Sequence, residues 1–330
     1  MMNAKLKMLQ DYPHENETTE FMNDVVVGLS RSQKQLSSKY FYDSVGSDLF
    51  NQITRHPDYY LTTCEIEILT NLKEELSNVL KNESFNLIEL GPGEGIKPRL
   101  LIDQFLKDGL SFSYFTIDIS KNYLTHLVHQ FNQQLPELDI IAINADYLSG
   151  MKWLKEQSEK RNIVLFLGSS IGNFDLSISK RFLQNIRSSL HAGDYMLIGF
   201  DLRKDIDTLL RAYNDNDGIT RAFNLNLLQR INRELQADFD VNLFSHYGTY
   251  DVYAGAMKSY LLSLSEQTVT IPPSNKMFSF EKFEPIHVES SYKFLFSQIK
   301  MLADTSQFEI IKNYTDPKEY FANSLWQARK

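Results

Sequence analysis

Short apolar segments alternate with amphipathic ones along the middle of the chain. The apolar segments are residues 85–90, 113–118, 139–144, 162–167 and 195–200. Each is short enough to be a strand, and the stretches between them have the apolar spacing of helices. Those helices are expected near residues 98–107, 121–134, 150–158 and 176–190. Strands separated by helices predict an α/β fold with a parallel sheet covered on both faces.

Different patterns flank this region. Residues 65–76 place their apolar positions on one helical face, which predicts a clear helix. Residues 1 to about 20 are polar and predict a loose lead-in, and residues 21–60 predict short helices broken by polar stretches.

After the fifth strand the alternation stops. Residues 203–246 predict mostly helix, and residues 257–293 predict strands and loops. A helix is expected near residues 291–304, followed by a hairpin of residues 308–314 and 320–328. The hairpin would complete a seven-stranded sheet.

Composition limits the class of protein. A length of 330 residues suggests about two domains. Hydrophobic residues make up 42% and charged residues 23%, an ordinary globular mixture. The formal charge is −8, and a surface of that sign repels phosphate backbones. We therefore expect a small-molecule partner and no nucleic acid.

The chain has one cysteine, Cys64, which excludes an intrachain disulfide and a cysteine-based zinc site. The histidines show no metal-binding spacing, so no metal is expected. The longest apolar run, residues 163–167, is too short to span a bilayer, and the first residues lack a signal-peptide core. These features predict a cytoplasmic protein without a membrane segment.

The first strand ends in a motif that indicates a nucleotide-like ligand. Glu89 is followed by Gly91, Gly93 and Gly95, and Asp118 closes the second strand. Closely spaced glycines let the backbone approach a ligand, and a carboxylate at the next strand end can accept hydrogen bonds from ribose hydroxyls. The alternative is a structural tight turn in another α/β fold.

The glycine spacing decides between two cofactor classes. A dinucleotide fingerprint requires a third glycine where this chain has Ile96. The string Glu-x-Gly-x-Gly-x-Gly is instead similar to the S-adenosylmethionine loop of class I methyltransferases. We include Lys97, which follows the loop, among the candidate cofactor residues.

The third and fourth strands also end in polar residues. Asp146 could accept from an adenine amine while the ring of Tyr147 stacks on the base, although Asp146 could equally be a helix N-cap. Asn173 could hold an amine through its carbonyl oxygen, or it could cap the next helix. Gly168 begins this fourth segment and joins the candidate cofactor residues. All these positions would lie at the carboxyl edge of one sheet, where α/β folds bind ligands.

Several long strings resemble a known family. They are YFYDSVGSDLF at residues 40–50, PDYYLT at 57–62, GSSIGNF at 168–174 and AYNDNDGITRAFN at 212–224. Together they resemble the histidine Nα-methyltransferase family of ergothioneine biosynthesis, called EgtD-like. The likeness runs from about residue 38 to the end of the chain and is far more specific than the glycine loop.

The resemblance implies a Rossmann-like class I methyltransferase sheet with a second, α+β substrate-binding domain. Residues 64–202 with 294–330 would form the first domain, and residues 11–63 with 203–293 the second, with the substrate at their junction. The implied activity is trimethylation of the α-amine of L-histidine, with S-adenosyl-L-methionine as methyl donor, by a protein expected to be a monomer.

The resemblance also implies the substrate residues. Tyr59 and Asn173 would flank the amine and carboxylate, with Tyr213 on the carboxylate and Tyr42 near the reacting amine.

A second group of residues would recognise the substrate side chain. The family reads the imidazole ring with a Glu and a Ser two residues apart, which fall on Glu289 and Ser291. From the residues alone, Glu289 could instead be a solvated carboxylate on an edge strand. Ser259 stands where the family usually has Met, so the wall of the side-chain pocket would be smaller and more polar.

Three alternatives remain at this point. The substrate could be another amino acid, such as tyrosine, tryptophan or a histidine derivative. The chain could be a non-catalytic S-adenosylmethionine-binding module, although such a module needs no amino-acid clamp. A nicotinamide-dependent dehydrogenase is disfavoured by the missing third glycine.

Overall fold

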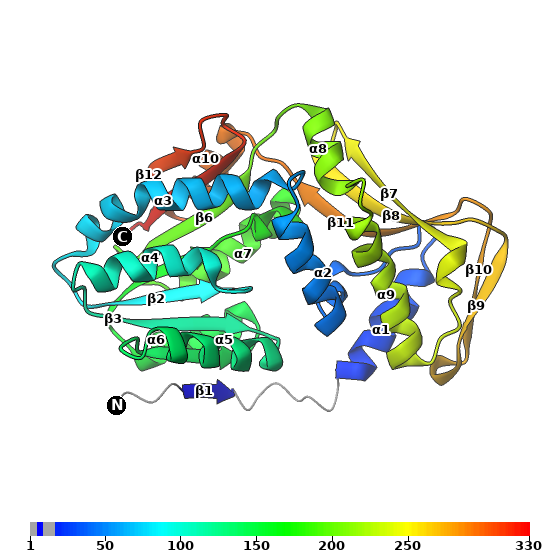
Figure 1. Cartoon of the computed structure of the whole chain (residues 1–330), viewed down its shortest axis with the longest axis horizontal. Coiled ribbons are helices and arrows are strands. Elements are labelled where there is room, and N and C mark those ends of the chain that lie inside the picture. Colours follow the sequence, from blue (N-terminus) through cyan, green and yellow to red (C-terminus); the bar gives the residue numbers. More distant parts are fainter. Residues whose placement is uncertain (1–4, 9–16) are drawn as a thin grey trace. The chain divides into compact units, whose positions relative to one another are not determined.

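A computed structural model describes residues 5–8 and 17–330 of the chain. These residues form two compact units (Figure 1). The first contains residues 5–8, Leu61–Arg203 and Phe294–Lys330. The second contains residues 17–60 together with Lys204–Lys293. Each unit is therefore assembled from segments that lie far apart in the sequence.

Within the described residues, the first unit is built on an eight-stranded sheet in the order β1-β4-β3-β2-β5-β6-β13-β12. The strands β1 to β6 are parallel to their neighbours, whereas β13 is antiparallel to both β6 and β12. The strands are β1 (Lys5–Met8), β2 (Phe85–Leu90), β3 (Phe112–Asp118), β4 (Ile140–Asn144), β5 (Arg161–Phe166), β6 (Tyr195–Asp201), β12 (Phe308–Thr315) and β13 (Phe321–Ala328). The predicted α/β class is confirmed.

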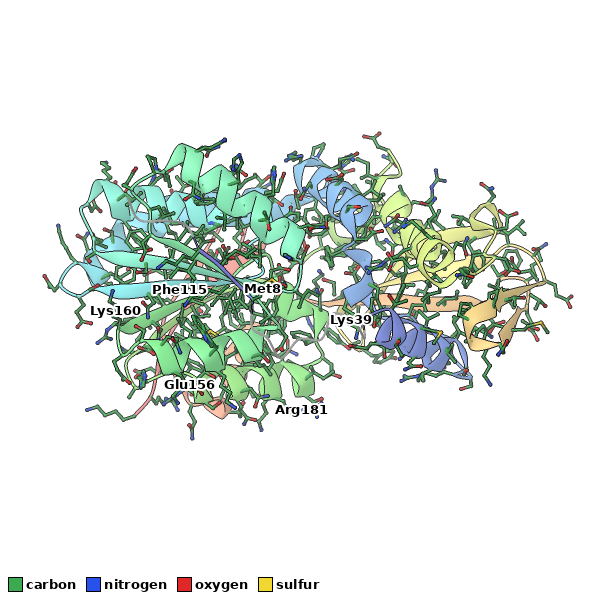
Figure 2. The ribbon with its side chains drawn as sticks, turned by 90° about the horizontal axis from the view of Figure 1, so that it is seen from below. Met8, Lys39, Phe115, Glu156, Lys160 and Arg181 are labelled. Atoms are coloured by element: carbon green, nitrogen blue, oxygen red, sulfur yellow. The ribbon has the colours of Figure 1, made fainter. Side chains whose placement is uncertain are left out.

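Helices accompany the strands of this sheet in Figure 1. They are α3 (Tyr60–Leu80), α4 (Ile96–Lys107), α5 (Lys121–Gln134), α6 (Tyr147–Gln157), α7 (Leu176–Ser188) and α10 (Phe296–Thr305). Every residue of β2 is buried, as expected for a central parallel strand covered on both faces. Figure 2 shows the contrast between buried and exposed positions: Phe115 of β3 lies inside the unit, while Glu156 and Lys160 extend outward.

Strand order places a ligand-binding edge in this sheet. The strand β2 pairs with β3 on one side and with β5 on the other, so the chain order reverses there. Open α/β sheets bind ligands at the carboxyl ends of the strands beside such a switch point. The loops after β2, β3 and β5 all reach this edge.

Three expectations about the elements were wrong. The sheet has eight strands because residues 5–8 pair in parallel with β4, and α1 (Glu17–Leu29), a helix of the second unit, begins inside the predicted lead-in. The rest of that lead-in, residues 1–4 and 9–16, lies outside the described residues. A strand of four residues carries too short an alternation to be recognised. The last helix begins at residue 296 because the preceding strand extends to Tyr292.

The second unit combines two small antiparallel sheets with helices. One sheet has the order β11-β8-β7 and the other pairs β10 with β9. The strands are β7 (Phe244–Asp251), β8 (Ala256–Ser263), β9 (Gln267–Ile271), β10 (Lys276–Phe280) and β11 (Pro285–Tyr292). The main helices are α1, α2 (Ser44–Arg55), α8 (Ile206–Tyr213) and α9 (Ile219–Leu235).

One apolar core holds this second unit together. Side chains of α1 and α9 pack with those of the strands, among them Val25, Leu227, Leu261 and Ile286, all of which are 1% exposed or less. At about 25 cal/mol per Å² of apolar surface removed from water, such packing is the main stabilising contribution. The unit can thus carry a binding surface of its own.

Candidate active site

The glycine loop after β2 separates packing from ligand access. Gly91, Gly93 and Gly95 all have positive φ, at 71°, 53° and 72°. A Cβ on Gly95 would lie 2.6 Å from the Phe131 ring, so the core requires this glycine. A Cβ on Gly93 would meet nothing within 4 Å. Of the three glycines, Gly93 alone has its backbone facing open space, where a ligand can approach it closely.

Carboxyl groups lie at the neighbouring strand ends. Asp118 is half-buried at the end of β3 and accepts a hydrogen bond from the Ser120 amide at 2.8 Å, and burial raises its pKa to about 6. Asp146 caps α6 by accepting from the amides of Leu148 and Ser149, both through Oδ1. The cap interpretation therefore holds for Asp146, and its second carboxylate oxygen makes neither of these bonds.

Glu89 and Tyr147 lie near the glycine loop. Glu89 is buried, accepts a hydrogen bond from the Tyr114 hydroxyl, and has a pKa raised by burial to about 8. Tyr147 packs edge-on against Phe166, with ring centroids 5.8 Å apart, and its hydroxyl would touch any Cβ on Gly91. Tyr147 thus packs against the loop at Gly91, whereas the hydrogen bond of Glu89 joins β2 to β3.

Lys97 lies with Gly168 at the edge of β5. A Cβ on Gly168 would be 3.2 Å from Lys97 Nζ, and Lys97 Nζ is 2.7 Å from Glu65 Oε2. The same oxygen of Glu65 accepts from the Gly168 amide at 2.8 Å, and its Oε1 accepts from Asn323 Nδ2 at 2.9 Å. Glu65 is fully buried on α3. One carboxylate therefore fixes two of the predicted cofactor residues.

Sequence reasoning missed Glu65, although a signal was present. It lies three and four residues before Ile68 and Leu69, which puts it on the apolar face of its helix. A charged residue on a buried face is rare unless it has partners. Its partners come from α4, from the loop after β5 and from β13, which only the fold brings together.

Asn173 ends a short 3₁₀ helix, η3 (Ser170–Asn173), after β5. Its side chain is exposed and makes no hydrogen bond to any described residue. The following helix α7 is capped by Asp175, which accepts from the Ile178 amide at 2.8 Å. The alternative role of Asn173 as a helix cap is therefore wrong, and its amide is available for another partner.

In the second unit, a β-bulge decides where Glu289 lies. His287 pairs with Tyr260 and Glu289 with Ser259, so Val288 is an extra residue in β11. Without the bulge, Glu289 would share the outer face with His287, because side chains alternate along a strand. With the bulge, Glu289 and Ser291 lie on the same sheet face as the buried residues Ser259 and Met257.

That face carries the three predicted side-chain-recognition residues together. Glu289 is half-buried, directly opposite the buried hydroxyl of Ser259, and burial raises its pKa to about 7 against the opposing charge of Lys293. Although β11 is an end strand of its sheet, Glu289 is not the solvated carboxylate that an end strand suggests.

Tyr213 joins this cluster through hydrogen bonds. It ends α8, is buried, and its hydroxyl donates to Ser291 Oγ at 2.7 Å. Lys293 Nζ donates to the Tyr213 hydroxyl at 2.7 Å and to Ser291 Oγ at 2.8 Å. Sequence analysis did not single out Lys293, which is only 1% exposed.

Aromatic contacts connect the remaining tyrosines to the cluster. The ring centroids of Tyr59 and Tyr213 are 6.5 Å apart, and Tyr59 also contacts Phe50 at 6.3 Å. Tyr42 packs edge-on against Phe50 at 5.4 Å and is 40% exposed. Ring contacts in the second unit thus run from Tyr42 through Phe50 and Tyr59 to Tyr213.

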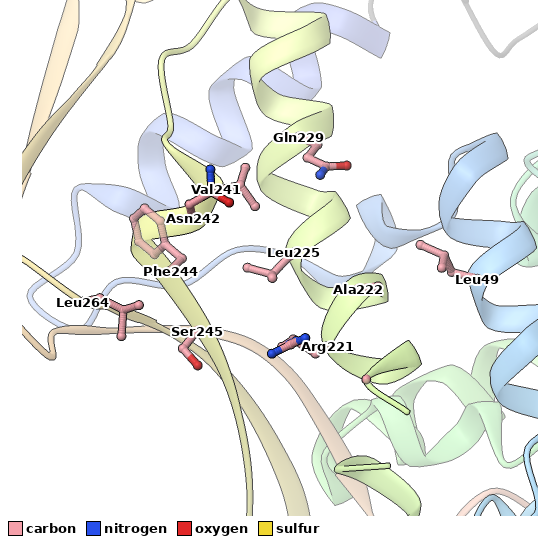
Figure 3. A pocket seen from close by; sticks show the side chains of 11 residues that line it. Leu49, Arg221, Ala222, Leu225, Gln229, Val241, Asn242, Phe244, Ser245 and Leu264 are labelled. Atoms are coloured by element: carbon pink, nitrogen blue, oxygen red, sulfur yellow. The ribbon is translucent and has the colours of Figure 1, made fainter. Parts of the chain in front are cut away.

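A pocket of about 550 Å³ in this unit is separate from these residues. It lies beside α9 and is lined by side chains such as Arg221, Leu225 and Phe244 (Figure 3). None of the predicted site residues lines it.

In the described part of the chain, no helix is long and apolar enough to cross a membrane.

Comparison with known proteins identifies the family of the chain. Residues 21–328 match the family described as "Histidine-specific methyltransferase, SAM-dependent". The chain is 33% identical over 302 residues to the histidine N-alpha-methyltransferases of Mycolicibacterium smegmatis and Mycobacterium tuberculosis, covering 92% of this chain and 93% of each relative. It is 29% identical over 288 residues to ergothioneine biosynthesis protein 1 of Schizosaccharomyces pombe, covering 85% of this chain and 37% of that protein. The chain therefore belongs to the family of histidine-specific methyltransferases that use S-adenosylmethionine.

Proposed function

We propose that this enzyme transfers three methyl groups to the α-nitrogen of L-histidine and forms N,N,N-trimethyl-L-histidine, the betaine of histidine. The observation that carries the proposal is the cluster of Glu289, Ser291 and Ser259 on one sheet face, to which the Tyr213 hydroxyl is hydrogen-bonded. A protein that only bound the methyl donor would need no such set of polar groups. The names of the relatives support the α-nitrogen as the acceptor.

We assign the methyl donor to the first unit, in keeping with the predicted domain of residues 64–202 and 294–330. The bare backbone at Gly93, the carboxyl group of Asp118 and the ammonium of Lys97 suit an adenosine with an amino-acid tail. Asp118 would accept from the ribose hydroxyls, and Asp146 with Tyr147 would meet the base. When bound, S-adenosylmethionine supplies an electrophilic methyl group on a sulfonium.

The chain's own contribution to the chemistry is positioning. As the C–N bond forms, the C–S bond breaks, and the amine must enter the step with its lone pair unprotonated. Asn173 offers a neutral carbonyl oxygen to an amine N–H, and Tyr42 a hydroxyl. A carboxylate at the amine would favour the ammonium and slow attack. Neutral acceptors also suit a nitrogen that loses its N–H groups as methyl groups are added.

We assign the amino-acid substrate to the second unit, in keeping with the predicted domain of residues 11–63 and 203–293. Tyr59 and Tyr213 would hold the carboxylate, while Glu289 and Ser291 would bind the imidazole ring. Ser259 adds a small, polar wall opposite Glu289. A carboxylate acceptor beside hydroxyl groups suits a ring that carries both N–H and unprotonated nitrogen.

Product analysis tests this proposal directly. The purified enzyme is incubated with S-adenosylmethionine and, separately, with histidine, tyrosine, tryptophan and other amino acids, and the products are identified by mass spectrometry with fragmentation. Three methyl groups on the α-nitrogen of histidine are expected. Preferred methylation of another amino acid, or of a ring nitrogen, would replace the proposal.

Single substitutions test the residue roles. Asn173→Ala should lower kcat/KM for histidine by roughly tenfold to a thousandfold, because the amine loses its orienting partner. Glu289→Ala should weaken histidine binding far more than binding of S-adenosylhomocysteine, as measured by calorimetry. Unchanged turnover in the first variant, or equal losses of both ligands in the second, would remove these assignments.

A further inference from the structure

A buried lysine lies at the base of the side-chain cluster. Lys293 follows β11 directly, and its ammonium is also 4.5 Å from the centroid of the Tyr213 ring. Removing a lysine from water is costly unless polar groups replace the solvent. Lys293 Nζ, Tyr213 Oη and Ser291 Oγ form a closed triangle with sides of 2.7, 2.8 and 2.7 Å.

The direction of these hydrogen bonds follows from the chemistry of the groups. An ammonium has three donors and no lone pair, so Lys293 can only donate. A hydroxyl oxygen has two lone pairs and one hydrogen. Ser291 Oγ accepts from both Lys293 and Tyr213, which occupies both of its lone pairs. Its own hydrogen is then what it can offer to a further partner.

Binding of a substrate carboxylate to Tyr213 leaves the hydrogen bonds from Lys293 in place. If Tyr213 turns its hydrogen toward the carboxylate, Lys293 still donates to both hydroxyl oxygens, and Ser291 then has one hydrogen and one open lone pair. The positive charge within hydrogen-bond distance of Ser291 also disfavours the approach of a cationic N–H. Ser291 therefore meets the side chain of the substrate as a donor.

Glu289 provides the complementary group. It lies two residues before Ser291 on the same face of β11, and an ionised carboxylate only accepts hydrogen bonds. One acceptor beside one donor matches a neutral imidazole, which carries one N–H and one unprotonated nitrogen. An imidazolium, with two N–H groups, would place a hydrogen against the donor.

We propose that Lys293 is a positioning residue that fixes Ser291 as a hydrogen-bond donor and so makes the cluster selective for the neutral imidazole ring. The inference rests on the proposed assignment of Glu289 and Ser291 to the substrate side chain. It adds to that assignment a role for the buried ammonium that donates to Ser291 Oγ.

The test compares L-histidine with 3-(pyrrol-2-yl)-L-alanine, which keeps a ring N–H but has no acceptor nitrogen. The wild-type enzyme should prefer histidine in kcat/KM by about tenfold or more. In Lys293→Met, the charge that keeps a ring N–H away from Ser291 Oγ is gone, so the preference should fall toward parity. Ser291→Ala should lose the preference in the same way. An equal loss of kcat/KM for both substrates in Lys293→Met would mean a merely structural role and would overturn the proposal.

Tyr213→Phe is the matched control, because it removes the hydroxyl but leaves Lys293 beside Ser291. Its KM should rise for both substrates while the preference for histidine is kept. If Lys293→Met does not fold, the comparison of Tyr213→Phe with Ser291→Ala still shows which hydroxyl is the donor to the ring. Loss of the preference for histidine in Tyr213→Phe would assign the donor to Tyr213 and overturn the proposal. A wild-type enzyme that methylates neither substrate on the α-nitrogen would instead refute the proposed function.

Discussion

Asp118 shows how burial prepares a single residue for ligand binding. Its pKa is raised from 3.8 to about 6, because the half-buried carboxylate has given up much of its hydration. Polar ligand groups that donate to the carboxylate would replace the lost water. The same applies to Glu289, whose pKa is raised to about 7 in the second unit.

The raised pKa of Asp118 predicts a pH dependence of donor binding. Because the ionised carboxylate is the stronger acceptor for ribose hydroxyls, affinity for S-adenosylhomocysteine should fall as the pH drops below about 6, by up to roughly tenfold per pH unit. Asp118→Asn should bind more weakly at pH 8 and lose the slope between pH 5 and 7. Calorimetry at several pH values measures both effects.

The exposed Asp103→Asn on α4 serves as the control for this experiment and should keep the wild-type slope. A slope that persists in Asp118→Asn would assign the titration to another group.

At the scale of elements, the loop between β2 and α4 combines two demands at neighbouring glycines. Gly95 is required by packing against Phe131 and Leu127 of α5, whereas Gly93 faces open space. Both have positive φ, where an L-residue costs about 1–2 kcal/mol. Gly95 therefore matters mainly for the stability of the loop, and Gly93 for the access of a ligand to its backbone.

This separation can be measured with alanine at each position. Gly93→Ala should cost about 1–2 kcal/mol of unfolding free energy from backbone strain and weaken S-adenosylhomocysteine binding at least about tenfold. Gly95→Ala should cost more, about 2–5 kcal/mol, because overpacking adds to the strain. Denaturant unfolding and calorimetry give the two quantities, and wild-type binding by Gly93→Ala would place the donor elsewhere.

At the scale of the whole molecule, Glu65 joins segments that are distant in sequence. From α3 it contacts Lys97 of α4, the Gly168 amide after β5 and Asn323 of β13. The backbone of Gly199 in β6 leaves the space for its carboxylate, because a Cβ there would overlap Oε1. The buried carboxylate of Glu65 thus connects residues at the carboxyl ends of the parallel strands with the hairpin of β12 and β13.

Removing this carboxylate should affect both stability and donor binding. Glu65→Ala leaves the Lys97 ammonium and the Gly168 amide without their partner, so we expect a loss of about 3–5 kcal/mol in the free energy of unfolding. Affinity for S-adenosylhomocysteine should fall as well, since Lys97 is no longer held beside Gly168. Glu67→Ala, at an exposed position of the same helix, should change stability by no more than about 0.5 kcal/mol.

A stable Glu65→Ala variant with wild-type affinity would show that the network around Glu65 is dispensable.

Much of the first unit was predictable because its signals are local. The strands β2 to β6 are short apolar runs bounded by polar turns, and the glycine loop is contiguous in sequence. The strand β1 was missed because its short pattern gains meaning only from pairing with β4. The face of Glu289 was not predictable from alternation, because one extra residue, Val288, reverses it.

The sequence by itself determined the fold class, the glycine loop and the family, since each depends on residues that are neighbours along the chain or on long ordered strings. Only the tertiary structure decided which polar side chains share an environment. Glu65 reaches Lys97 and Asn323, and Lys293 reaches Tyr213, because distant segments fold against one another and exclude water from the charges between them. A buried charge must find its partners in space, and separation along the chain does not say which they are.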